Sequence, residues 1–118
     1  MVCLDKSEPG RTVWRMVADE RFANPTGIIQ GGFLAAFADS SMGAAALTFA
    51  RERKVFAANA EMKVSFLRPV PMGSTLTCTA HVLSGGNKAV FAEADVVDER
   101  DRLVLKASST YLLWARDG

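Results

Sequence analysis

The chain has 118 residues, of which 49% are hydrophobic and 23% are charged. This length is that of one ordinary domain, and the composition is typical of a chain that buries a core, which excludes a disordered protein. Lys and Arg number 14 against 13 Asp and Glu, and the formal charge is +1. That balance gives no electrostatic reason to expect nucleic acid or an anionic membrane as a partner.

Residues 1–10 end in the turn signal Pro9-Gly10, and we expect them to be a loosely held lead-in. Residues 11–118 are predicted to form a single domain. The start of the chain lacks a basic stretch followed by an apolar one, so we expect a cytoplasmic location. Cys3 and Cys78 are predicted to be free thiols, and two cysteines with a single histidine favour no metal site.

Apolar and polar side chains alternate over residues 11–18, which predicts a first strand. Turn chemistry follows at residues 24–27, and then an Ala-rich stretch runs from Gly31 to Ala50. Three cations within residues 51–54 suit the negative end of a helix dipole, so a helix is predicted to end there. The Ala-rich stretch holds an aspartate, two serines and three glycines, which indicates a buried core helix rather than a membrane span.

Four segments after the helix alternate with a period of two and are predicted to be strands: residues 58–67, 74–83, 90–96 and 103–113. In the first of them the apolar residues alternate with polar ones, which are Asn59, Glu61, Lys63 and Ser65. One helix with five to six antiparallel strands gives an α+β fold, in which a curled sheet wraps a long central helix. An exposed edge strand remains, and pairing it across a two-fold axis predicts at least a dimer.

Asp39 is the one charged residue between Gly32 and Ala50. An ionised carboxylate inside an apolar helix costs on the order of several kcal/mol unless something compensates for it. The residues three and four positions away are small or flexible, and they leave room for a second chain or a substrate. Asp39 is therefore a candidate catalytic carboxylate. The alternative is a structural acid that Ser40 or Ser41 satisfies locally.

Gly31 and Gly32 form the second candidate feature. Two glycines at a helix start permit a close backbone approach and offer unpaired N–H groups at the positive end of the dipole, where an oxyanion can bind. Eight residues separate Gly31 from Asp39, which is about 12 Å along a helix. One helix does not easily bring both to a single carbonyl group, and a second subunit would supply the missing partner.

Residues 24–32, followed by Asp39 and Gly43, resemble the signature of hotdog-fold acyl-CoA thioesterases of the phenylacetate-pathway (PaaI-like) type. Residues 66–69 and 81–87 resemble a later strand and hairpin of the same family, and the similarity covers residues 11–114. The resemblance implies a hotdog fold, hydrolysis of an acyl-CoA thioester and a homodimer, with a tetramer built as a dimer of dimers. It implies no cofactor, since coenzyme A is part of the substrate.

The resemblance also implies roles for individual residues. Asp39 corresponds to the nucleophile or to the general base for a water, and the Gly31 amide to the oxyanion donor. Asn24 resembles the side chain that helps hold the thioester or the attacking water, and Asn59 lies where related enzymes place a water-positioning hydroxyl. The residues expected near coenzyme A are Arg68, Ser84, Gly85, Gly86, Asn87 and Lys88, where backbone amides and cations suit pantetheine and phosphates.

Gln30 departs from the family pattern, which usually has His at this position. Glutamine donates a hydrogen bond but does not shuttle a proton near pH 7. The sequence therefore leaves three interpretations: an acyl-CoA thioesterase, a non-catalytic acyl-CoA-binding or effector-sensing domain, and a dehydratase. The last is disfavoured because the one histidine, His81, lies outside the motif. Neither the acyl-chain preference nor the packing of a tetramer follows from the sequence.

Overall fold

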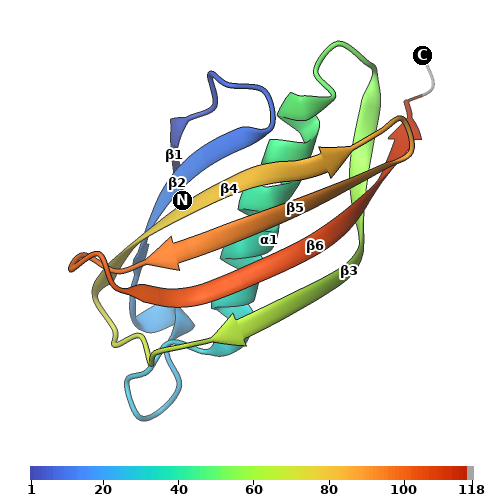
Figure 1. Ribbon diagram of the computed structural model, residues 1–118. Coiled ribbons are helices and arrows are strands. Elements are labelled where there is room, and N and C mark those ends of the chain that lie inside the picture. The colour runs from blue at the N-terminus through green and yellow to red at the C-terminus, as the bar shows by residue number, and fades with distance from the viewer. Residues whose placement is uncertain (117–118) are drawn as a thin grey trace.

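A computed structural model describes residues 1–116, which form one long helix and a six-stranded sheet (Figure 1). The last two residues of the predicted domain lie outside the described residues. The elements are β1 (Val2–Asp5), β2 (Arg11–Ala18), the 3-10 helix η1 (Glu20–Phe22), α1 (Gly31–Phe49), β3 (Val55–Phe66), β4 (Ser74–Gly85), β5 (Ala89–Val97) and β6 (Leu103–Ala115).

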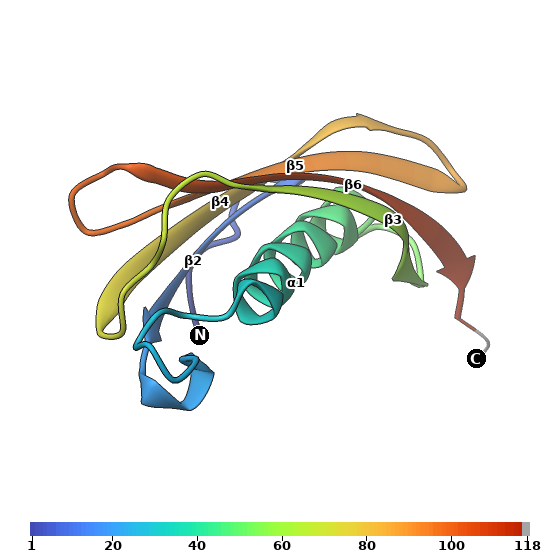
Figure 2. The ribbon, with the colours of Figure 1, turned by 90° about the horizontal axis from the view of Figure 1, so that it is seen from below.

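The sheet is antiparallel throughout, with the strand order β1-β2-β4-β5-β6-β3. It curls over α1, which lies against its concave face, while the opposite side of the helix is left uncovered (Figure 2). The predicted fold class, one long helix wrapped by a curled antiparallel sheet, is confirmed. β3 is an edge strand, so one row of its backbone groups has no neighbouring strand within residues 1–116.

The core lies between α1 and the sheet. Small side chains on the helix allow close packing, because Ala38, Ala45 and Ala46 are fully buried beside Met42. By length and by a mean hydropathy of 1.2, α1 also passes as a candidate membrane span. Its contacts with β2 to β6 identify it as the core helix that the sequence predicts.

The exposed side of α1 is unusual for a surface helix, because it is apolar as well. Phe33 and Leu47 are 40% and 43% exposed, and Gly32 and Ala36 are also exposed. A helix that is apolar all round is normally covered on every side. The single chain therefore presents an apolar helix face that nothing in residues 1–116 covers.

The expectation of a loosely held lead-in is wrong for residues 2–5. They form β1, which pairs with β2 through Val2 opposite Arg15 and Cys3 opposite Trp14. Pairing satisfies backbone groups that β2 would otherwise expose at the sheet edge. A four-residue strand has too short a pattern to be recognised in the sequence.

The helix ends slightly earlier than the cations suggest. α1 stops at Phe49, and no basic residue lies in its last turn. Arg51 nevertheless reaches back, and its Nε donates a 3.1 Å hydrogen bond to the carbonyl of Thr48. The predicted interaction between a cation and the carbonyl end of the helix is thus made from the following turn.

Candidate active site

Asp39 projects from the middle of α1 toward β3 and β6. Its Oδ1 atom accepts a 2.6 Å hydrogen bond from the Tyr111 hydroxyl and a 2.9 Å bond from Asn59 Nδ2. The alternative in which Ser40 or Ser41 satisfies Asp39 is wrong, because the Ser41 hydroxyl donates to the carbonyl of Phe37. Asp39 is half-buried, so the carboxylate is held by two donors from the sheet and still reaches solvent.

Asn59 faces the helix, where its Nδ2 donates to Asp39. Val55 and Ala57 precede it on the inner face and pack on the core, as do Met62 and Val64 beyond it. The register shifts between Asn59 and Glu61, so one extra residue interrupts the alternation. Such β-bulges re-aim side chains and are common beside active sites.

Ser109 on β6 fixes the orientation of the Asn59 side chain. Its hydroxyl lies 2.9 Å from Asn59 Oδ1 and 2.6 Å from the carbonyl of Glu61. Because the Asp39 carboxylate only accepts hydrogen bonds, Asn59 must present its NH₂ group to it and its oxygen to Ser109. One N–H of the Asn59 side chain therefore donates to Asp39. The other N–H of the same NH₂ group is left to donate to a water or a substrate.

Tyr111 is the functional residue that the sequence interpretation missed. It lies directly opposite Asn59 in the β3–β6 ladder and is 3% exposed. Its ring fills the space beside Gly43, where a Cβ would lie 3.6 Å from Cε1. The room beside Asp39 is thus taken partly by this ring. Burial, and then the hydrogen bond and charge of Asp39, raise the pKa of Tyr111 above its ordinary value.

A signal for Tyr111 was present in the sequence of the last strand. Its inward positions are otherwise small or apolar, and Ser109 and Tyr111 are buried in the same alternating series. Polar groups on a buried face require partners. The partner of Tyr111 lies 72 residues away on α1, so the alternation predicts a need for a partner without naming it.

The start of α1 carries the second group of candidate residues. Gln30 is the N-cap, its side chain makes no capping hydrogen bond, and it is exposed. Phe33 and Leu34 donate their amides to the Gln30 carbonyl. The amides of Gly31 and Gly32 have no acceptor within residues 1–116, as expected for the first turn of a helix.

Gly31 and Arg68 line one cavity of about 260 Å³, together with Phe66 and the chain from Leu67 to Val70. Phe66 lies against Gly31, where an added Cβ would be 3.0 Å from its ring. The structure thus brings Gly31 and Arg68, two residues predicted independently, to one place. An amide at the positive end of the helix dipole and a guanidinium are both suited to anionic or carbonyl oxygen.

Asn24 has a structural task as well as its predicted one. Its Oδ1 accepts hydrogen bonds from the amides of Thr26 and Ile28 and from the Thr26 hydroxyl. This arrangement closes the turn in which Gly27 adopts a φ of +84°. The Asn24 NH₂ group has no partner in the described part of the chain, so it is available to a ligand.

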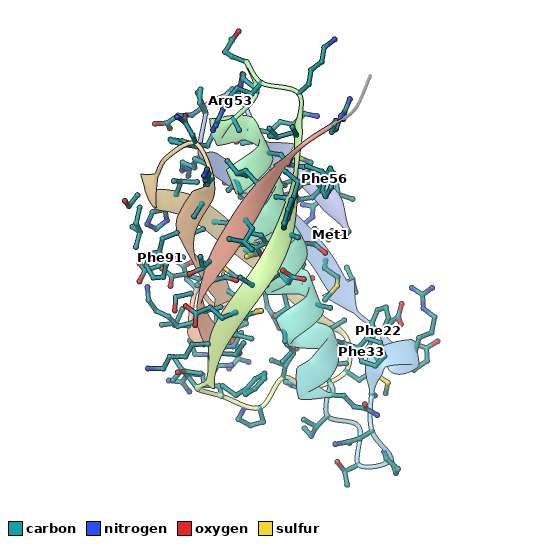
Figure 3. All side chains as sticks on the ribbon, turned by 90° about the vertical axis from the view of Figure 1, so that its right-hand side faces the viewer. Met1, Phe22, Phe33, Arg53, Phe56 and Phe91 are labelled. Atoms are coloured by element: carbon teal, nitrogen blue, oxygen red, sulfur yellow. The ribbon has the colours of Figure 1, made fainter. Side chains whose placement is uncertain are left out.

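The predicted coenzyme A residues do not lie together in one chain. The hairpin that holds Ser84, Gly85, Gly86, Asn87 and Lys88 lies beside the end of α1, where Arg53 donates to the carbonyls of Gly86 and Asn87. Arg68 lies beside the start of α1. In Figure 3, Arg53 marks one end of the molecule, and Phe22 and Phe33 mark the other.

An apolar cavity of about 190 Å³ lies beside the first half of α1. It is lined by Met1, Met16, Phe22, Phe33, Ala36, Phe37 and Ser40. The rings of Phe22 and Phe33 are 4.8 Å apart and tilted. Across residues 1–116, no group of three or more His, Cys, Asp and Glu side chains could hold a metal ion.

Comparisons with known proteins agree with this architecture. A sequence model described as the thioesterase superfamily matches residues 26–105. Human acyl-coenzyme A thioesterase 13 is 26% identical over 98 residues, which cover 83% of this chain and 69% of the human protein.

Two solved structures have the same fold. A Streptococcus mutans protein bound to acetyl CoA superposes with a TM-score of 0.89 at 16% identity, covering 99% of this chain and 90% of that one. The Escherichia coli PaaI protein of the phenylacetic acid degradation operon gives 0.81 at 24% identity, covering 94% and 75%. The chain therefore belongs to the thioesterase superfamily and is a hotdog-fold thioester hydrolase.

Proposed function

We propose that this protein hydrolyses acyl-CoA thioesters to coenzyme A and a free acid, with Asp39 as nucleophile or as general base for a water. The observation that carries the proposal is the Asp39 carboxylate, which two donors hold through Oδ1 beside solvent. The name of the human relative and the acetyl CoA bound to the Streptococcus mutans protein support the substrate class. Gln30 supplies a hydrogen-bond donor but no proton shuttle, so water or Asp39 must carry the proton.

In this proposal the oxyanion donor is the Gly31 amide of a second copy of the chain. Within one chain, Asp39 contacts Asn59 on β3, and Gly31 contacts Phe66 at the end of the same strand. A two-fold axis beside the midpoint of these strand positions, at Met62 and Lys63, would place Asn59 of one copy opposite Phe66 of the other. Antiparallel pairing of the two β3 edges would therefore bring each Asp39 toward the Gly31 of the other copy.

Two further features support this dimer. The exposed apolar side of α1 needs a cover, and a second copy supplies one. The same antiparallel pairing places Arg68 of one copy near the hairpin of residues 84–88 of the other. The two parts of the predicted coenzyme A site, which lie at opposite ends of one chain, would then meet.

The outer face of the sheet supports a tetramer built as a dimer of dimers. Phe56 and Trp114 are paired across β3 and β6 and are 50% and 52% exposed, and Leu112 beside them is 38% exposed. Exposed Lys54, which directly precedes β3, lies at one side of this apolar band, and exposed Glu61 in β3 lies at the other. A two-fold axis across the strands would set Lys54 of one copy against Glu61 of another. Trp114→Glu should therefore convert tetramers to dimers in light scattering, whereas unchanged tetramers would contradict this packing.

Release of coenzyme A from short, medium and aromatic acyl-CoAs tests the activity. Wild-type protein should hydrolyse at least one class, and Asp39→Asn should fold normally with kcat lower by about 10²-fold or more, the scale of a lost general base. Equal rates for wild type and Asp39→Asn would refute the assigned role of Asp39. Tight coenzyme A binding without hydrolysis by the wild type would favour the non-catalytic acyl-CoA-binding function.

A further inference from the structure

The two hydrogen bonds to Asp39 converge on one oxygen atom. Tyr111 and Asn59 both donate to Oδ1, at 2.6 Å and 2.9 Å. Oδ2 receives no hydrogen bond from any donor in residues 1–116. A carboxylate normally rotates with little preference about its last torsion, so two donors on one oxygen make its two oxygens different.

We propose that Tyr111 is a positioning residue which, with Asn59, holds Oδ1 so that Oδ2 is the reacting oxygen. Oδ2 either attacks the thioester carbonyl carbon or takes a proton from the water that attacks it, and in both cases the C–S bond breaks and coenzyme A leaves as the thiolate. This inference rests on the proposed function and adds to it which atom reacts and what orients that atom. Tyr111 acts through Asp39 and does not itself touch the substrate.

Tyr111 is well placed to act as a rigid donor. Its ring is buried, lies against Gly43, and is anchored on β6 between β5 and β3. Burial and the neighbouring carboxylate raise the pKa of Tyr111, so the phenol keeps its proton at neutral pH and remains a donor. Asn59, itself held by Ser109, approaches the same oxygen from the neighbouring strand.

A purely structural role explains the contacts of Tyr111 less well. Its hydroxyl also lies 2.9 Å from the backbone carbonyl of Asp39, but that carbonyl already has a partner in the next turn of the helix. The hydroxyl has a single proton, and the ionised carboxylate at 2.6 Å is the stronger acceptor. The side-chain bond is therefore the one that a loss of the hydroxyl would remove.

Tyr111→Phe tests the proposal with little change in packing. We expect kcat for acyl-CoA hydrolysis to fall about 10- to 100-fold, the scale of a hydrogen bond to a charged group, while KM stays within about twofold. Thr110→Val is a matched control, because Thr110 adjoins Tyr111 in β6. Its hydroxyl also donates a hydrogen bond to a carboxylate, that of Glu61, at 3.1 Å. The kcat of this variant should equal that of the wild type.

Repeating the substitution in an Asp39→Ala protein separates an effect on the position of Asp39 from a general effect on folding. If Tyr111 acts through Asp39, Tyr111→Phe should lower residual kcat no further in an Asp39→Ala protein, whereas an independent effect would multiply. Asn59→Ala, at an exposed position that shares the same acceptor, should also lower kcat at constant KM, and it carries the test if Tyr111→Phe unfolds. If Tyr111→Phe and Asn59→Ala fold and keep the wild-type kcat, the positioning role is overturned while the proposed function stands. If both Asp39→Ala and Tyr111→Phe keep wild-type activity, the proposed function is overturned as well.

Discussion

The middle of α1 and its first turn carry the two groups of site residues, and they are built differently. Around Asp39 the chain supplies its own partners: Tyr111, Asn59 and Ser109 form a continuous hydrogen-bonded series. At the first turn, the amides of Gly31 and Gly32 find no acceptor in the described chain, and Gln30 is exposed. One region is closed by the fold, and the other consists of donors without partners.

This difference indicates what each region does under the proposed function. A closed network fixes the direction of a reacting carboxylate before substrate arrives, which reduces the reorganisation needed in the transition state. Open donors at a helix start stabilise charge that appears only during the reaction. The separation of about 12 Å along the helix means that the two regions act on one carbonyl only when two copies of the chain combine.

The largest effect is expected at the open region, from Gly31→Pro. Proline removes the amide proton, suits the first helical position, and is compatible with the ψ of 138° at Gln30. Loss of an oxyanion donor should lower kcat about 10²- to 10³-fold. Gly31→Ala is the control, because it adds the same Cβ against Phe66 and keeps the N–H. Equal kcat in the two variants would exclude the Gly31 amide as oxyanion donor.

Mixing two inactive variants tests whether the regions combine across copies. Asp39→Asn chains keep Gly31, and Gly31→Pro chains keep Asp39. In a refolded equal mixture, about half of the dimers would be mixed, each with one complete site, so activity should return to about a quarter of the wild-type level. A mixture that is no more active than its components would show that the two regions do not meet across a two-fold axis.

The sequence predicts the open region better than the closed one. The helix from Gly31 to Phe49 follows from its Ala-rich composition and its first-turn glycines, which are local signals. Gly31 and Arg68 share a cavity, although the sequence reasoning reached them separately. Local patterns therefore suffice where a functional group belongs to the backbone of a helix end.

The closed region depends on a register that local patterns do not carry. Alternation counted back from Met62 and Val64 would turn Asn59 away from Asp39, and the bulge between Asn59 and Glu61 instead leaves it facing the helix. Tyr111 meets Asp39 only because β6 lies beside β3, a neighbour relation that skips β4 and β5 along the chain. Strand pairing at long sequence separation is set by tertiary packing, so Tyr111 could not be named beforehand, and Asn59 was named only through the family resemblance.

The smallest expected effect is a loss of stability at high pH, which measures how well the side of α1 that faces the sheet is shielded from water. Cys78, buried under α1, has its thiol pKa raised to about 11 from 9.0, chiefly by burial. The folded protein thus holds this proton more tightly than the unfolded chain, so the stabilisation is complete below pH 9. It is lost as the pH rises from 9 toward 11, by about 2 kcal/mol in the free energy of unfolding.

Urea denaturation at pH 8, 9, 10 and 11 measures this loss, and Cys78→Ala supplies the comparison. Cys78→Ala should be less stable at pH 8, because it leaves a small cavity, but should lose less stability up to pH 11. Tyr111→Phe should remove a further part of the decline above pH 10, since burial and Asp39 raise the pKa of that phenol in the same direction. If both variants declined as steeply as the wild type, the buried side of α1 would be open to water. The contrast between a closed and an open region would then fail.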